Sequence, residues 1–213
     1  MQQRLQVFYF MVAALSALAF AGTVVLHFVP NWVTYPNENG TPRYGLWKAC
    51  TDFHNTGAGE EESSQCRRYW DERWEEEAEL VHAPTKAAAS FFIFGMFFNI
   101  ILFVFVLGIA LCIAKVDYYP GVPVTLAAIT FVMYAVGCSV MEWVVKWRLT
   151  HHARNHQGLP RNAPRDVGPA AYGAWTSLAC MGMNFILGIL ILVFKPTKDE
   201  IRKNIEMQFE VNV

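Results

Sequence analysis

The residues best suited to covalent chemistry in this sequence are Cys50 and Cys66, two thiols in a polar stretch of a largely apolar chain. Fifteen residues separate them, and in the simple chain model closing such a loop removes about 3 kcal/mol of unfolded-state entropy. A pair of cysteines in one polar segment suits an oxidising compartment, where disulfides persist. We therefore predict a disulfide between Cys50 and Cys66, with two free thiols as the alternative.

Two further groups of side chains could hold a metal or carry charge near a membrane. His152 and His156 lie one helical turn apart, but no cysteine or acid lies within 150–157 to complete a tetrahedral site. We expect no metal site there. Glu142 lies four residues before Lys146, and an acid at membrane depth is a functional candidate by default. Because this spacing on a helix also favours a salt bridge, we predict the salt bridge.

Catalytic motifs are missing from the sequence. It contains no Gly-rich phosphate loop, no H-E-x-x-H and no serine or cysteine in a nucleophile context. An enzyme acting on lipids within the membrane would need an intramembrane acid–histidine set, which the sequence also lacks. We expect no enzymatic activity, no cofactor and no nucleic-acid partner.

The elements that position these residues follow from the composition, which is 54% hydrophobic and only 16% charged against a usual quarter. The apolar residues form four long blocks, and a helix of about twenty residues crosses the ~30 Å hydrocarbon core. The blocks are far too long for the strands of a membrane barrel. We predict a membrane all-α four-helix transmembrane bundle that forms a single domain, 1–213. Its segments are a span at 7–29, a loop at 30–86, a span at 87–114, a turn at 115–120, a span at 121–143, a loop at 144–168, a span at 169–194 and a tail at 195–213.

The first apolar block also resembles a secretory signal peptide, with small residues at 19–21 as a cleavage site. However, apolar character continues through 22–29, which gives a full span instead of a short signal. Ala13, Ala17 and Ala21 recur every fourth residue, as in closely packed membrane helices. We expect this span to be retained, and cleavage before Gly22 is the alternative.

The orientation of the spans has conflicting signals. The two larger connections hold eleven basic residues against six in the termini and the short turn, which by raw count places those connections inside. Asn39 begins an Asn-Gly-Thr glycosylation pattern in the first loop, which also carries the two cysteines. That loop has eleven acidic residues against six basic ones. We predict a multi-pass plasma-membrane protein with its loops outside and both termini in the cytosol.

Local patterns predict structure within the first loop. Segments 31–36, 43–53 and 66–70 are rich in aromatic and β-branched residues, which favours strands, and the glycines at 57–59 indicate a turn. Segment 69–81 has apolar residues at helical spacing opposite acids. We interpret it as a short solvated helix before Pro84, with an acidic lining beside an ion path as the alternative.

Several polar residues lie inside the predicted spans. Asn99 and Asn184 are expected to hydrogen-bond between helices, and Cys138 and Cys180 to pack as small apolar residues. Cys112, near the predicted cytosolic end of the second span, is a candidate for palmitoylation.

Trp32, the run Gly45-Leu46-Trp47, Cys50 and Cys66 resemble the W…GLW…C…C first-loop motif of the claudin superfamily. That superfamily includes claudins, the peripheral myelin protein group, and the gamma and stargazin-type channel auxiliary subunits. The resemblance extends to four spans, a large first loop, a tight cytosolic turn and a shorter second loop. The segment AAYGAWTSL at 170–178 is similar to the opening of the claudin fourth helix. The motif is specific because it needs two tryptophans and two cysteines in order.

The resemblance implies an extracellular antiparallel sheet, with four strands from the first loop and one from the second, fused to a left-handed bundle. In that setting Cys50 and Cys66 would link neighbouring strands, and Trp32, Leu46 and Trp47 would seat the sheet on the helices. Two features depart from the pattern. The cysteines are further apart than in most claudins, and a lysine, at position 86, stands where a claudin usually has an arginine.

The resemblance implies a protein of cell–cell junctions. It would pack beside copies of itself or related four-span proteins in one membrane, meet partners on the facing cell, and restrict paracellular movement. The acidic excess of the first loop would then favour cations. The alternative is an auxiliary subunit that modulates an ion channel or receptor. Besides membrane lipid, the expected partners include a PDZ scaffold, because Val211 and Val213 flank Asn212 at a free carboxylate; an ordinary apolar end is the alternative.

Overall fold

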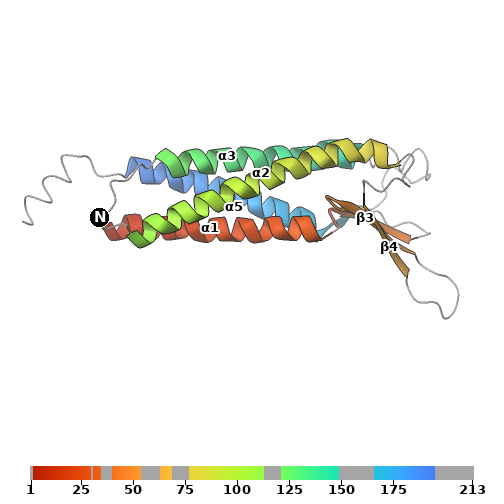
Figure 1. The fold of residues 1–213 in the computed structure, drawn as a ribbon, viewed down its shortest axis with the longest axis horizontal. Coiled ribbons are helices and arrows are strands. Elements are labelled where there is room, and N and C mark those ends of the chain that lie inside the picture. Colours follow the sequence, from red (N-terminus) through yellow and green to blue (C-terminus); the bar gives the residue numbers. More distant parts are fainter. Residues whose placement is uncertain are drawn as a thin grey trace, which may run out of the picture.

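The computed structural model describes residues 2–29, 31–34, 40–53, 63–68, 77–112, 121–148 and 166–194. Four long helices lie side by side as a bundle, and a small β-sheet stands at one end of it (Figure 1). The N-terminus lies at the opposite end from the sheet. Four helices are long and apolar enough to cross a membrane, which supports a multi-pass membrane protein. The candidate spans are Gln6–Phe28, Ala83–Leu111, Gly121–Arg148 and Pro169–Val193.

Of the four helices of the bundle, the first three are longer than the predicted spans, when the continuation of the third to residue 148 is included, and the fourth is one residue shorter. They are α1 (Gln2–Phe28), α2 (Glu77–Cys112), α3 (Gly121–Ser139) and α5 (Pro169–Val193). A π-helical segment, η1 (Val140–Val145), continues α3, and helical backbone extends to residue 148. Within a bilayer a helix satisfies its own backbone polar groups, so long uninterrupted helices are the expected solution.

Two helices extend beyond the predicted spans. α2 begins at Glu77 and continues through Pro84, so 77–81 is the start of this helix and not part of a separate short one. A proline removes one i→i−4 hydrogen bond, a loss that a long packed helix tolerates. The third helix also runs five residues past the predicted end at 143. Lys146 and Arg148 lie in this extension, where cations interact favourably with the negative end of the helix dipole.

The sheet has five strands in the order β4-β3-β2-β1-β5, and every pairing is antiparallel. Three strands have five or six residues, and the two that pair between the first and the second loop have two residues each. The five strands are β1 (Val33–Thr34), β2 (Gly40–Tyr44), β3 (Lys48–Phe53), β4 (Ser63–Arg68) and β5 (Asp166–Val167). Four strands therefore come from the first loop and one from the second. The turn predicted at 57–59 lies outside the described residues.

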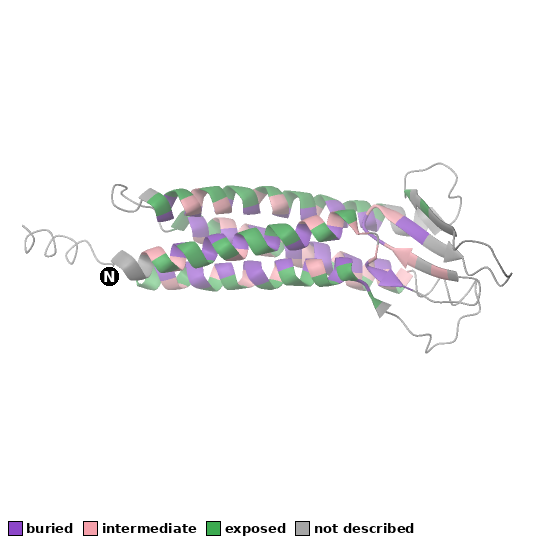
Figure 2. Cartoon of the chain, turned by 90° about the horizontal axis from the view of Figure 1, so that it is seen from below, coloured by how far each residue is buried: buried purple, intermediate pink, exposed green. Residues whose placement is uncertain are grey.

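Buried residues line the inside of the bundle, and exposed residues cover its outer faces (Figure 2). The buried apolar residues form two clusters. The sheet-side core comprises Ala19, Leu26, Trp32, Val33, Leu46, Ala49, Ala88, Ala89, Phe92, Tyr134, Cys138, Met141, Val145, Ala170, Ala171, Ala174, Cys180 and Met181. The far core comprises Tyr9, Val12, Ala13, Leu102, Val106, Ile109, Ala110, Ala127, Leu187 and Ile191.

The packing face of α1 differs from the predicted alanine stripe. Ala13 is buried, but Ala17 and Ala21 are exposed. The close approach is made instead by Gly22 of α1 and Gly173 of α5: a Cβ built on Gly22 would lie 2.6 Å from the Gly173 carbonyl oxygen. Backbones pack this closely in membrane helices when the residues between them are small. A four-residue alanine spacing alone did not identify which face carries that contact.

Candidate functional site

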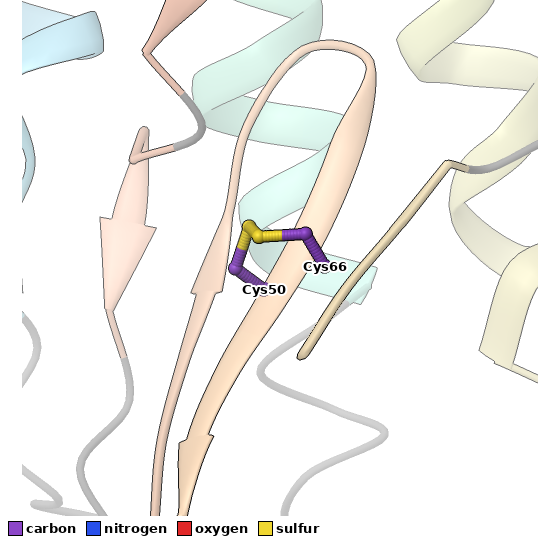
Figure 3. The surroundings of a disulfide bond; sticks show 2 residues. All are labelled: Cys50 and Cys66. Atoms are coloured by element: carbon purple, nitrogen blue, oxygen red, sulfur yellow. A yellow bond between two sulfur atoms is a disulfide. The ribbon is translucent and has the colours of Figure 1, made fainter. Parts of the chain in front are cut away.

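The sheet and its attachment to the bundle form the candidate functional site. The first part of this site is the β3–β4 hairpin. Cys50 and Cys66 lie directly opposite each other in the register of these strands. The predicted disulfide between them is present (Figure 3). Cys50 is buried on β3, next to Ala49 of the sheet-side core, whereas Cys66 is exposed on the edge strand β4. The bond therefore ties the edge strand to a strand that is anchored by packing.

The Gly-Leu-Trp run forms the turn between β2 and β3. The Gly45 amide donates to the Lys48 carbonyl at 3.0 Å, which closes the turn next to the last β2–β3 pair. Leu46 is buried in the sheet-side core, and Trp47 packs at its margin. The Trp47 ring lies 5.8 Å from the ring of His27 in the last turn of α1. The turn therefore points its two large apolar side chains at the end of the bundle.

Trp32 connects the sheet to the bundle through both its backbone and its side chain. Its amide donates to the Tyr44 carbonyl at 2.6 Å, and its carbonyl accepts from the Gly168 amide at 2.9 Å. The indole is almost fully buried, with its ring centroid 6.3 Å from that of Phe92 in α2. Phe92 in turn lies 5.9 Å from the ring of Tyr134 in α3. Aromatic pairs at these separations add to the energy of burial.

The junction between β5 and α5 depends on two residues that the sequence analysis missed, Asn31 and Gly168. The Asn31 carbonyl accepts from the Ala170 amide at 3.1 Å, and its side-chain oxygen accepts from the Thr34 hydroxyl at 2.8 Å. A Cβ on Gly168 would lie 2.0 Å from the Asn31 carbonyl oxygen, so only glycine fits there. A glycine directly before a Pro-initiated helix was the available signal.

A polar network beneath the sheet joins three helices, and it too was missed. Thr23 of α1 donates to the Ala19 carbonyl at 2.8 Å and hydrogen-bonds the Tyr134 phenol of α3. Ser177 of α5 donates to the same Ala19 carbonyl, also at 2.8 Å. All of these side chains are buried. Hydrogen bonds of this kind hold membrane helices together where water cannot compete.

The two span asparagines bond across helices, as predicted. Asn99 of α2 donates to the Ser16 carbonyl at 2.9 Å, and Asn184 of α5 donates to the Ser16 hydroxyl at 3.0 Å. Both amides are 1% exposed. Ser16 of α1 is therefore the common acceptor of two neighbouring helices, a role that its residue type alone did not indicate.

The predicted salt bridge in the third helix is present. The Lys146 ammonium lies 2.8 Å from the Glu142 carboxylate, at i,i+4 spacing across η1. The two side chains are partly exposed, which suits an interfacial pair better than a buried functional acid.

The remaining predicted sites are not all covered by the structure. Asn39, His152, His156 and the chain end with Val211 and Val213 lie outside the described residues. Cys112 is the last residue of α2, and its side chain is not among those described. Cys138 and Cys180 are free and buried. Among the described residues no group of three His, Cys, Asp or Glu could hold a metal ion.

No protein-family model matches the chain, and no curated protein matches it significantly. The resemblance to claudins therefore depends on the motif residues and on the architecture around them. In that architecture Trp32, Leu46 and Trp47 belong to the contact between the sheet and the helices, and the disulfide links two strands of the sheet.

Proposed function

We propose that the chain is a claudin-like membrane protein of cell–cell junctions, with its sheet outside the cell and both termini in the cytosol. It packs beside copies of itself or related four-span proteins, and its loops meet partners on the facing cell. In this role it resides in the plasma membrane at cell contacts and restricts paracellular movement of ions and solutes.

The observation that carries this proposal is that the motif residues link the strands of the sheet and attach the sheet to the helices. Trp32 and Leu46 attach a five-stranded sheet to four helices, and Cys50–Cys66 links its outer hairpin. A sheet fixed in this way is held in one position relative to the ends of the helices. Rigid presentation is what two facing membranes need in order to dock through loops, because ordering flexible segments at an interface costs free energy.

Charge supports a cation preference for any paracellular route that the loops line. The first loop carries eleven acidic residues against six basic ones, and a surface of one sign concentrates ions of the opposite sign. The sequence 60–62 is a run of three glutamates. These are the side chains to neutralise in a functional test.

The test is electrical. We expect expression in an epithelial layer of low resistance to change the transepithelial resistance and to raise the sodium-to-chloride permeability ratio measured from diffusion potentials. Replacing Glu60, Glu61 and Glu62 with glutamine should lower that ratio while the protein still reaches cell borders. A matched control replaces three acids of the tail, Asp199, Glu200 and Glu206, with their amides. If resistance and charge preference stay at the level of untransfected cells, the junction proposal is wrong.

A second candidate function is an auxiliary subunit of an ion channel or receptor. The wide spacing of Cys50 and Cys66, which departs from most claudins at the hairpin they use for contacts between cells, favours it. Such a subunit would use the same sheet and helix surface to grip one partner. Purification in a mild detergent discriminates the two roles: a stoichiometric channel supports the auxiliary role, whereas strands of the protein alone at cell contacts support the junction role.

A PDZ scaffold is the proposed cytosolic partner in either role. A terminal carboxylate with alternate valines, Val211 and Val213, fits the added-strand mode of PDZ capture. Adding one residue after Val213 should abolish capture by a PDZ scaffold, and unchanged capture would argue against this partner.

A further inference from the structure

Four aromatic side chains with a polar atom stand exposed on the outside of the bundle near its sheet end. Trp143 and Trp147, one helical turn apart at the end of the third helix, are 79% and 65% exposed. Tyr172 and Trp175, in the first two turns of α5, are 63% and 45% exposed. We refer to these four residues as the aromatic band. Tryptophan and tyrosine on the outer face of a membrane bundle are suited to the interface between hydrocarbon and water.

The spacing of the band along two antiparallel helices matches the thickness of a bilayer. Trp143 lies 22 residues after Gly121, where α3 begins. Tyr172 lies 22 residues before Phe194, the residue that caps α5. At 1.5 Å per residue each interval spans about 33 Å, which slightly exceeds the ~30 Å hydrocarbon core. Trp143 and Tyr172 therefore lie at similar distances from the helix ends opposite the sheet.

The opposite end of the bundle has a different outer surface. Among the described residues there, the large exposed side chains are aliphatic or phenylalanine, with no exposed tryptophan or tyrosine. They include Val7, Phe10, Leu111, Val122 and Val193. Side chains of this kind lack a donor for headgroups and suit hydrocarbon. Among the described residues, large apolar side chains are therefore exposed at both ends of the bundle, and exposed aromatic side chains with a polar atom occur only beside the sheet.

The salt bridge lies within the band. Glu142 directly precedes Trp143, and Lys146 directly precedes Trp147. The side chains of Glu142 and Lys146 are 18% and 26% exposed. A paired acid and base are tolerated where hydrocarbon gives way to headgroups, and their presence marks the same boundary as the tryptophans. Two chemically different features thus place the interface at one level of the third helix.

We propose that the aromatic band is a membrane anchor that holds the bundle at the headgroup level of the leaflet beside the sheet. The indole N–H and phenol O–H groups donate to lipid carbonyl and phosphate oxygens, while the ring faces lie against the acyl chains. The occupant is the bilayer interface itself, and the inference holds for either proposed function. It fixes the sheet directly on the headgroups and places the first turns of α2, from Glu77 to Lys86, above the hydrocarbon.

Depth measurement by spin labelling tests the anchor. Cysteine replaces Trp143, Tyr172 or Val132 in turn, in a chain whose other free cysteines, Cys112, Cys138 and Cys180, are changed to alanine. The labelled chains are reconstituted in phosphatidylcholine vesicles. Val132 is the control, because it is exposed and lies 11 residues before Trp143, or about 16 Å along the helix. We expect the labels at 143 and 172 to report one shared interfacial depth and the label at 132 to report the bilayer centre. Labels at 143 and 172 that differ by more than one helical turn, or shielding of both from lipid-soluble oxygen by a protein neighbour, would overturn the proposal.

A second variant separates an anchor from a passive surface. Trp143→Leu with Trp147→Leu keeps an apolar side chain at each position and removes the interfacial preference, and both positions are exposed, so the core is unchanged. In this background we expect the label at 172 to move toward the bilayer centre. Val132→Leu should leave it in place. An unchanged depth at 172 in the double variant means that the band does not anchor the protein.

Discussion

The two ends of the bundle are packed by different means. In the sheet-side core, alanine is the commonest residue and helix backbones meet through Gly22 and Gly173, held by hydrogen bonds among Thr23, Tyr134 and Ser177. The far core is built mainly from valine, leucine and isoleucine. Close backbone contacts and directional bonds define one geometry, whereas aliphatic packing tolerates substitution when volume is kept. The packing of the helices is therefore defined most precisely at the end of the bundle that carries the sheet.

Removing the Trp32 side chain should have the largest effect and should separate the two regions. Truncating a buried tryptophan to alanine costs about 3–5 kcal/mol. Because the indole packs between the sheet and α2, we expect Trp32→Ala to raise hydrogen exchange in β1, β2 and β3 while the far core stays protected. Leu102→Ala in the far core is the matched control and should destabilise the bundle without releasing the sheet. Equal loosening at both ends would show that the regions are not distinct.

Opening the disulfide should act on the sheet alone. In the simple chain model it contributes about 3 kcal/mol, and it joins β3 to the exposed Cys66 of the edge strand β4. We expect Cys50→Ser with Cys66→Ser to raise amide exchange in β3 and β4 and to leave helix content and the unfolding midpoint of the bundle unchanged. A reductant should mimic this in the natural chain and have no effect on the double variant. A drop in helix content would contradict the view that the disulfide stabilises the sheet and not the helices.

Glycine substitutions should sharpen the contrast between the ends. A Cβ on Gly22 would meet backbone at 2.6 Å, whereas nothing lies within 4 Å of one on Gly108 near the far end of α2. We expect Gly22→Ala to destabilise the bundle by about 1–3 kcal/mol through overpacking. Gly108→Ala should be neutral or stabilise by up to about 1 kcal/mol, since alanine favours helix. Thermal unfolding in detergent measures both, and a similar cost for the two would refute precise packing at Gly22.

The smallest expected effect tests bonds across helices against bonds within one. Asn99→Leu removes a bond from α2 to Ser16 of α1, and such bonds average about 0.6 kcal/mol. Thr130→Val removes a bond to Leu126 within α3 and should be close to neutral. Combining Asn99→Leu with Asn184→Leu should give a non-additive loss, because both amides use Ser16. Strict additivity would mean that Ser16 does not couple them.

Much of the fold could be predicted from the sequence because it follows from local composition. Four apolar blocks require helices in a bilayer, and the strand segments around Cys50 are marked by aromatic and β-branched residues. The interhelical bonds of Asn99 and the salt bridge of Glu142 follow from the cost of polar groups in lipid. Each of these inferences needs only a residue and its immediate environment.

What could not be predicted depends on contacts between distant segments. Gly22 and Gly173 meet because α1 and α5 cross there, and no spacing within either helix specifies the partner. Asn31 and Gly168 are likewise defined by a contact between the two loops. Segment 69–81 was predicted to be a separate short helix because Pro84 reads locally as a break, whereas α2, which begins at Glu77, continues through it.

The central claim is that a disulfide-linked sheet stands outside the cell on a bundle of membrane helices, and its most direct test is thiol mapping in intact cells. We predict that the peptides containing Cys50 and Cys66 remain joined until a membrane-impermeant reductant is added outside. Both thiols should then react with an impermeant maleimide, while the buried Cys138 and Cys180 stay unmodified. Unlinked thiols at 50 and 66 that react only after the membrane is permeabilised would contradict the account.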